Sequence, residues 1–387
     1  MKLLLVDNVH IYKTDDGEYY TPSIYNKSFF DRYLKVFSSV RLVAKTRRAN
    51  ISEVEGFIHI DFENVEIFEL EWYKGIKELI FKLPKIIPRL RTSTVGCGCI
   101  IYRVAQIESF LVYKFVKKSI PYAVEVVNDP ECWDFVGKTV RSLSSKMLRH
   151  ICKNANGAAY VTERYLQKKY PCSNKAFSSY YSSIELEEKY ILSPKHFDYD
   201  ELKIVHVSNA IDGNEKGHDT VLLATKKLIN EGYKIRVCFI GGGPGVQRFI
   251  QMADDENIGK FVDFVGRISN KDEYMSALAQ NDVLVFPSHS EGLPRVVIES
   301  MACGLPCIVS PVGGTPELVD DWCLVNFDDV NGYVRAISNL INDRELYRKT
   351  SKNNFEKSKS FEITVLERRR TAFYKKLEGL ADKQKGE

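Results

Sequence analysis

Two carboxylates, Glu291 and Glu299, are the residues whose type and spacing first suggest chemistry. Glu291 follows the small and polar residues 287–290, and Glu299 lies eight positions later among apolar neighbours. Carboxylate oxygens accept hydrogen bonds from pairs of neighbouring hydroxyls, which sugars and riboses both present. The simpler alternative is that Glu299 belongs to the exposed face of a helix and that Glu291 only caps a loop.

The elements around these glutamates predict an anion site. An apolar run at 283–286 reads as a buried strand, and a short loop leads from it into a helix that Pro294 opens and Gly304 ends. Proline is favoured in the first turn of a helix and glycine just past its end. The free N–H groups and the dipole of such a helix start favour a phosphate.

The segment from Pro287 to Ile308 closely resembles the signature of the retaining glycosyltransferases of family 4, which have the two-domain GT-B fold. That signature reads Pro-Ser-x-x-Glu-Gly-x-Pro, then Glu-x-Met-Ala-Cys-Gly-x-Pro-Val. This chain follows it almost without departure and continues into Gly-Gly-Thr-Pro-Glu-Leu at 313–318.

The resemblance implies roles for the residues of this segment. Glu291 would contact the transferred sugar, and Glu299 would hold the ribose hydroxyls of a nucleotide. Backbone N–H groups around Gly292, Leu293 and Pro294 would meet the hydroxyls and phosphates, although Pro294 itself has no N–H to donate.

A diphosphate also needs cations, and Lys216 is the candidate. The family places a phosphate-binding lysine in a Lys-Gly step, and here Lys216-Gly217 stands between a strand and a helical pattern. A solvent-exposed lysine in a loop is the alternative. Many relatives carry an arginine a few residues earlier, where this chain has 208–210, Ser-Asn-Ala. Either that loop is rebuilt, or a residue such as Arg267 supplies the second charge.

Two glycine-containing turns complete the predicted donor site. Residues 240–245 end a strand with glycines, Gly242 among them, as a close turn beneath a nucleotide would require. Any strand-to-helix turn can be glycine-rich, and no dinucleotide fingerprint follows. Gly266 and Arg267 resemble the family's loop that takes the nucleobase.

No metal site or other cofactor is expected. Asp198-Tyr199-Asp200 has the form of a metal-binding Asp-x-Asp, but it precedes a strand instead of following one. Cys97 and Cys99 lack a second pair at zinc-site spacing. Lys216 and the helix start would neutralise the leaving diphosphate instead, and the nucleotide sugar is a co-substrate.

Short apolar runs that read as strands, 56–62 and 323–325 among them, alternate with helical patterns along the whole chain. This alternation predicts an α/β fold with two doubly wound, Rossmann-like domains. We place an acceptor-binding domain at 1–185, a linker at 186–201 and a donor-binding domain at 202–360. A last helix at about 361–379 would pack back on the first domain. Ligands of such sheets bind at the carboxyl ends of the strands, so we expect a cleft between the domains.

The N-terminal half would bind the acceptor, because family 4 enzymes use that domain for it. Its segments 122–130 and 160–171 resemble bacterial transferases of polysaccharide-assembly clusters. Asp129 follows a predicted strand and is the candidate for orienting or deprotonating the acceptor hydroxyl. An Asp-Pro turn explains the same residue equally well.

Residues 1–190 hold 29 Lys and Arg against 22 Asp and Glu, while the rest of the chain is slightly acidic. Within that half, residues 72–91 combine six basic residues with large apolar ones. This composition predicts a segment lying on an anionic membrane surface, and Pro84 and Pro88 would interrupt its helix. An ordinary basic surface helix is the alternative.

No apolar stretch approaches the about 18 residues of a membrane-spanning helix, and the odd count of nine cysteines indicates reduced thiols. We therefore expect a cytoplasmic protein, peripheral on the inner leaflet. The resemblance implies retaining transfer of a sugar from a nucleoside-diphosphate sugar to a lipid-linked saccharide acceptor. We expect no nucleic-acid partner. The alternatives are a nucleotide-sugar epimerase or oxidoreductase, and a non-catalytic carbohydrate- or nucleic-acid-binding module.

Overall fold

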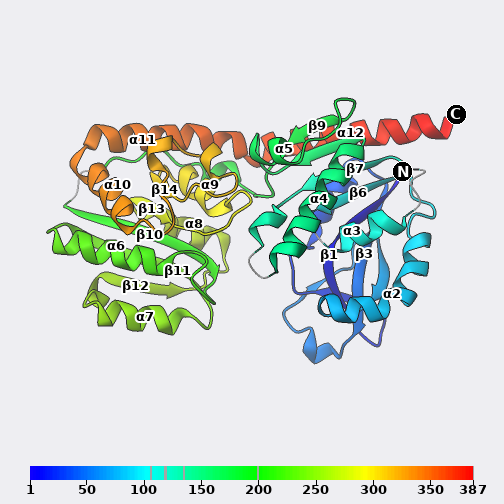
Figure 1. Cartoon of the computed structure of the whole chain (residues 1–387), viewed down its shortest axis with the longest axis horizontal. Helices are drawn as coiled ribbons and strands as arrows, with labels where there is room; N and C mark the ends of the chain where they lie inside the picture. Colours follow the sequence, from blue (N-terminus) through cyan, green and yellow to red (C-terminus); the bar gives the residue numbers. More distant parts are fainter. Residues whose placement is uncertain (105–106, 117–119, 134–135, 198–199, 387) are drawn as a thin grey trace. The chain divides into compact units, whose positions relative to one another are not determined.

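The chain folds into two compact units, each with its own parallel sheet (Figure 1). The computed structural model describes residues 1–104, 107–116, 120–133, 136–197 and 200–386. Unit 1 comprises Met1–Tyr181 and Glu367–Glu387, and unit 2 comprises Ser182–Leu366. The residues that we predicted as a linker lie at the start of unit 2, where the Leu192 N–H donates to Ala302 O at 2.9 Å.

Seven parallel strands form the centre of unit 1, in the order β5-β3-β1-β6-β7-β8-β9. They are β1 (Lys2–Lys13), β3 (Ser39–Arg48), β5 (Val65–Glu71), β6 (Cys99–Val104), β7 (Tyr122–Val126), β8 (Gly157–Tyr160) and β9 (Phe177–Tyr180). Two short antiparallel strands, β2 (Tyr19–Thr21) and β4 (Ile58–His59), extend the sheet beside the end of β1. Every residue of β6, β7 and β8 is buried, as expected for parallel strands covered on both faces.

One predicted strand of unit 1 is displaced. The expected strand at 56–62 shrinks to the two residues of β4, and the strand beside β3 is β5 instead. In β5 the glutamates Glu66, Glu69 and Glu71 interrupt the apolar residues. These glutamates lie on both faces of the strand, Glu66 on one and Glu69 and Glu71 on the other, which an edge strand tolerates because water reaches it. The residues of β5 therefore do not form the continuous apolar run that is typical of a buried parallel strand.

Five helices of unit 1 follow its strands: α1 (Lys27–Leu34), α2 (Gly75–Thr92), α3 (Ile107–Phe115), α4 (Lys138–Asn154) and α5 (Tyr165–Lys169). The prediction that Pro84 and Pro88 interrupt the helix at 72–91 is wrong, because α2 runs through both. Both prolines lie on its exposed side. Water can therefore hydrogen-bond to the carbonyl groups that lose their partner when proline removes an N–H.

The last helix, α12 (Ile363–Gly386), starts in unit 2 and belongs to unit 1 from Glu367 onward. Its Tyr374 ring stacks on Tyr33 with 5.1 Å between centroids, and its hydroxyl donates to the buried Glu125 at 2.5 Å. Arg103 lies beside the same carboxylate, with Nε 3.3 Å from Glu125 Oε2. The C-terminal helix therefore completes the core of unit 1.

Unit 2 is a five-stranded parallel sheet in the order β12-β11-β10-β13-β14. Its strands are β10 (Glu201–Ala210), β11 (Lys234–Gly242), β12 (Val262–Gly266), β13 (Val283–Phe286) and β14 (Cys307–Val309). Its helices are α6 (His218–Asn230), α7 (Val246–Asp255), α8 (Lys271–Ala279), α9 (Arg295–Ala302), α10 (Val330–Asn342) and α11 (Arg344–Ser358). The strand expected at 323–325 is a single bridge between Leu324 and Val309.

The strand order of unit 2 reverses beside β10, between β10 and β13. Right-handed crossovers place α6 and α7 on one face of the sheet and α8 and α9 on the other. The predicted α/β class with two doubly wound domains is thus confirmed. Among the described residues, no helix is both long and apolar enough to cross a membrane.

Candidate functional site

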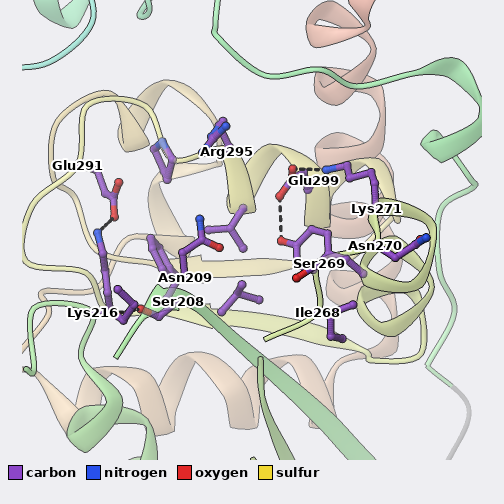
Figure 2. Close-up of a pocket in the computed structure, with 16 residues that line it drawn as sticks. Ser208, Asn209, Lys216, Ile268, Ser269, Asn270, Lys271, Glu291, Arg295 and Glu299 are labelled. Carbon is purple, nitrogen blue, oxygen red and sulfur yellow. Dashed lines mark hydrogen bonds and ion pairs between the residues drawn. The ribbon is translucent and has the colours of Figure 1, made fainter. Parts of the chain in front are cut away.

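A pocket of about 530 Å³ lies in unit 2 at the carboxyl ends of its strands (Figure 2). It is lined by the last residues of β10, by the loop after β12 and the start of α8, by Phe286 at the end of β13, and by the start of α9. Doubly wound sheets bind ligands at this place, where the order of the strands reverses. Lys216, Glu291, Pro294 and Glu299, all predicted site residues, line this pocket.

Hydrogen bonds hold Glu291 in the loop after β13. Ser288 Oγ donates to Glu291 Oε1 at 2.8 Å, and the backbone N–H of His289 donates to Glu215 O at 2.8 Å. Ser310, just after β14, donates its hydroxyl to Ser288 O. The carboxylate is therefore fixed by the loops that follow three different strands.

A glycine after β14 packs directly on the backbone of Glu291. Gly313 has φ +55°, and a Cβ atom there would lie 2.0 Å from Glu291 O. The N–H of Gly314 donates to Gly292 O at 2.8 Å. Only glycine allows this approach, which explains the glycine at position 313 of the motif.

Lys216 is ion-paired with Glu291 at one side of the pocket. Its Nζ lies 2.6 Å from Glu291 Oε1, and the lysine side chain is one-third exposed. The following Gly217 has φ +73°, and a Cβ atom there would lie 2.3 Å from Pro287 O. This contact ties the loop before α6 to the end of β13, so the lysine is held where a phosphate oxygen could replace the carboxylate as its partner.

Glu299 lies on α9 and is 8% exposed. Its Oε1 is 2.5 Å from Lys271 Nζ and its Oε2 accepts a hydrogen bond of 2.8 Å from the Tyr274 hydroxyl. Burial first, and then the neighbouring Glu299 carboxylate, raise the pKa of Tyr274 well above its usual value, so this hydroxyl remains a donor. The alternative that Glu299 belongs to an exposed helix face is therefore excluded.

Between the two carboxylates lies the N-terminus of α9. Pro294 is its N-cap residue, and Arg295 and Val296 of its first turn line the pocket with it. N–H groups in the first turn of a helix have no partner within the helix, and with the helix dipole they attract an anion. Gly292 and Leu293, predicted as donor-binding residues, precede this helix and do not line the pocket.

The other predicted donor residues lie beside the pocket instead of in its wall. The Arg267 guanidinium donates to Asn209 O at 3.0 Å and is exposed. Neither Arg267 nor Gly266 and Gly242 line the pocket, and the chain enters the lining at Ile268. The predicted loop after β12 is thus present, but it contributes later residues than we expected.

Asp129 does not have the surroundings of a general base. It is 2% exposed and accepts hydrogen bonds from Tyr165 (2.6 Å), Lys169 (2.6 Å), Tyr170 (2.5 Å) and the N–H of Glu131 (3.0 Å). Burial acts to raise its pKa, but the hydrogen bonds, that from Lys169 foremost, lower it. Its oxygens are already engaged, so the structure supports the Asp-Pro turn and not the acceptor-binding role.

The structure adds pocket residues that the sequence did not indicate: Asn209, Lys271, Tyr274 and Arg295. Lys271 and Tyr274 are three residues apart on α8, so both face the same side of the helix and meet Glu299. That spacing, just after a strand of the donor domain, is the signal that could have identified them.

Within the described ranges, no group of three or more His, Cys, Asp or Glu side chains could hold a metal ion. Asp198 and Tyr199 of the Asp-x-Asp segment lie outside those ranges.

Comparison with known proteins identifies the family. The sequence model of the protein family "glycosyl transferases group 1" matches residues 191–357 of this chain. The chain is 30% identical over 347 residues to Protein CapJ of Staphylococcus aureus, covering 88% of this chain and 86% of that protein. It is also 30% identical to N-acetyl-alpha-D-glucosaminyl L-malate synthase of Bacillus anthracis over 148 residues, 38% of this chain and 37% of that protein.

Solved structures share the fold at lower identity. Sucrose-phosphate synthase from Thermosynechococcus elongatus superposes with a TM-score of 0.70 at 18% identity, covering 98% of this chain and 99% of that one. Anabaena HepE, solved with UDP and glucose, superposes with a TM-score of 0.65 at 14% identity, covering 98% of this chain and 100% of that one. These findings confirm the resemblance to GT-B glycosyltransferases. The chain therefore belongs to the group 1 glycosyl transferases and is a nucleotide-sugar-dependent glycosyltransferase.

Proposed function

We propose that this enzyme is a retaining, metal-independent glycosyltransferase of family 4 that extends a lipid-linked saccharide in bacterial surface polysaccharide synthesis. One observation carries the proposal: Glu291 and Glu299 line a single pocket, and a helix N-terminus lies between them. A carboxylate for the sugar, N–H groups for phosphates and a carboxylate for the ribose follow one another in the order of a nucleotide sugar.

In the proposed reaction the bond between the anomeric carbon and the diphosphate oxygen breaks. Lys216 and the first N–H groups of α9 stabilise the negative charge that develops on the leaving diphosphate. Glu291 stabilises the oxocarbenium-like sugar. The acceptor hydroxyl bonds to the anomeric carbon from the face that the diphosphate leaves, and its proton passes to the departing phosphate oxygen.

The test has two readouts on one reaction. Nucleoside diphosphates and nucleotide sugars are first screened for thermal stabilisation, and the product formed from the best donor is then analysed by NMR. We expect the anomeric configuration of the donor to be kept and turnover to persist in EDTA. An inverted product would refute retention, and activity lost in EDTA and restored by Mn²⁺ would refute metal independence.

The lipid-linked acceptor is supported by the surface of α2. Phe81 and Ile80 are 86% and 59% exposed, and Lys77, Lys85 and Arg91 lie exposed on the same helix. Apolar side chains flanked by cations are typical of helices that lie in the interface of an anionic bilayer. We infer that α2 holds the enzyme at the membrane where its acceptor is anchored.

Co-sedimentation with vesicles tests this part. We expect binding to phosphatidylglycerol-containing vesicles, weaker binding to pure phosphatidylcholine, and a loss in Phe81→Ser. Leu143→Ser is the matched control, because Leu143 is a 65% exposed apolar residue of α4 in the same unit. Equal binding of the wild type, Phe81→Ser and Leu143→Ser would refute the membrane role of α2.

A further inference from the structure

The side chains that line the donor pocket carry a net positive charge. The lining holds three cations, Lys216, Lys271 and Arg295, and two carboxylates, those of Glu291 and Glu299, which leaves one positive charge in excess. Each lysine is already ion-paired with one of the glutamates. Arg295 is exposed, and no hydrogen bond or ion pair joins it to the residues that the structure describes.

Arg295 lies between the two ion pairs. Figure 2 shows Lys216 with Glu291 on one side of the pocket and Lys271 with Glu299 on the other, with Arg295 between them. It is the first residue of α9, so its guanidinium and the free N–H groups of the helix start belong to the same part of the pocket. This is the part of the wall with uncompensated positive charge.

We propose that Arg295 is the second cation of the diphosphate clamp, in place of the arginine that this chain lacks at 208–210. The inference rests on the proposed function, in which the sugar lies at Glu291 and the ribose at Glu299. The diphosphate that joins them must then pass Arg295. A guanidinium can donate two parallel hydrogen bonds to phosphate oxygens, which a lysine ammonium cannot.

The rival candidate is Arg267, the residue suggested by the sequence. Its guanidinium is hydrogen-bonded to the Asn209 carbonyl and it does not line the pocket. The two assignments therefore predict opposite results for the diphosphate affinity of the Arg295 and Arg267 variants.

Calorimetric titration distinguishes them. Wild type, Arg295→Gln and Arg267→Gln are titrated with UDP, GDP and ADP and with uridine, guanosine and adenosine. For the diphosphate that the wild type binds, Arg295→Gln should lose roughly ten- to a hundredfold in affinity, the range expected for a hydrogen bond to a charged group. Its affinity for the matching nucleoside should not change, and Arg295→Lys should recover part of the loss.

Lys352→Gln on α11 removes an exposed cation away from the pocket and should bind like the wild type. Unchanged diphosphate affinity in Arg295→Gln, or an equal loss for diphosphate and nucleoside, would overturn the assignment of Arg295. So would a loss confined to Arg267→Gln. If the wild type bound none of the three diphosphates, the proposed function would fail as well, so the two failures are distinguishable.

Discussion

Lys216 Nζ lies 2.6 Å from Glu291 Oε1, although 75 positions separate the two residues in the sequence. The pair joins the loop after β10 to the loop after β13. Both groups belong to the proposed chemistry, the lysine at the leaving diphosphate and the carboxylate at the sugar. In this structure each therefore neutralises the other, and donor binding must exchange this contact for contacts with the substrate.

Lys216→Ala should lower kcat/KM for the nucleotide sugar by roughly a hundred- to a thousandfold, because a preorganised charge at the leaving group is lost. The melting temperature should change little, since an ion pair with a one-third exposed lysine contributes little to stability. Lys216→Arg should retain part of the activity, and Lys227→Ala, on the exposed side of α6, should retain all of it. Wild-type turnover in Lys216→Ala would contradict the role.

Glu299→Gln should weaken nucleoside diphosphate binding about tenfold by removing a charged acceptor for the ribose hydroxyls. The decisive comparison uses a 2′,3′-dideoxynucleoside diphosphate, which lacks those hydroxyls. The wild type should prefer the normal nucleotide, and the variant should show no preference. A variant that keeps the preference would show that Glu299 acts elsewhere, for example only through Lys271 and Tyr274.

The loop that carries Lys216 is followed by a buried histidine, and this predicts acid sensitivity. His218 is 1% exposed and its ring stacks on Phe249 at 4.7 Å. Burial lowers the pKa of His218 to about 4, whereas an unfolded chain has its ordinary value near 6.5. The unfolded state therefore binds more protons between these values, so stability is complete above pH 6.5 and falls as the pH drops toward 4.

Chemical denaturation at pH 7 and at pH 5 measures this effect. The His218 contribution to the free energy of unfolding should fall by roughly 2 kcal/mol at pH 5. His218→Phe should make the pH dependence shallower, and the rest belongs in part to the buried neighbour His206, whose pKa burial also lowers. His59→Gln, at a 41% exposed histidine side chain, should leave the pH dependence unchanged. The prediction fails if His218→Phe and the wild type lose stability in parallel.

Tyr374→Phe tests the attachment of α12 to unit 1. The variant removes a 2.5 Å hydrogen bond to the buried Glu125 carboxylate, and a bond to a charged group is worth about 1.5–3 kcal/mol. Unfolding should report that loss, with nucleotide affinity unaffected because the donor pocket lies in unit 2. Tyr333→Phe in unit 2 removes a hydrogen bond to the neutral Val325 carbonyl and should cost less. An equal or smaller loss in Tyr374→Phe would contradict this account.

The sequence predicted the elements whose signals are local. The buried strand at 283–286, the helix opened by Pro294 and the glycines that follow are each specified within a few residues, and the structure brings Glu291, Glu299 and Lys216 to one pocket. The pocket residues that the sequence did not indicate are brought there by contacts with residues far away in the chain. Lys271 reaches Glu299 only because the connection from β12 returns across the sheet to β13.

Asp129 illustrates the same limit from the other side. A carboxylate after a strand suggests a site, but its role depends on which groups surround it. Here Tyr165 and Lys169 of α5 and the adjoining Tyr170, all more than thirty residues later, engage both oxygens. The sequence near Asp129 therefore does not predict which hydrogen-bond donors surround it.

The return of α12 to unit 1 has a consequence for synthesis on the ribosome. Glu125 and Tyr374 are 249 residues apart, so at roughly 5–20 residues per second the carboxylate waits on the order of 10–50 seconds for its last donor. All of unit 2 is translated within that interval. The half of the enzyme that is translated first is therefore completed last, and during the interval Glu125 has, among the described residues, only Tyr33, Tyr181 and Arg103 as its partners.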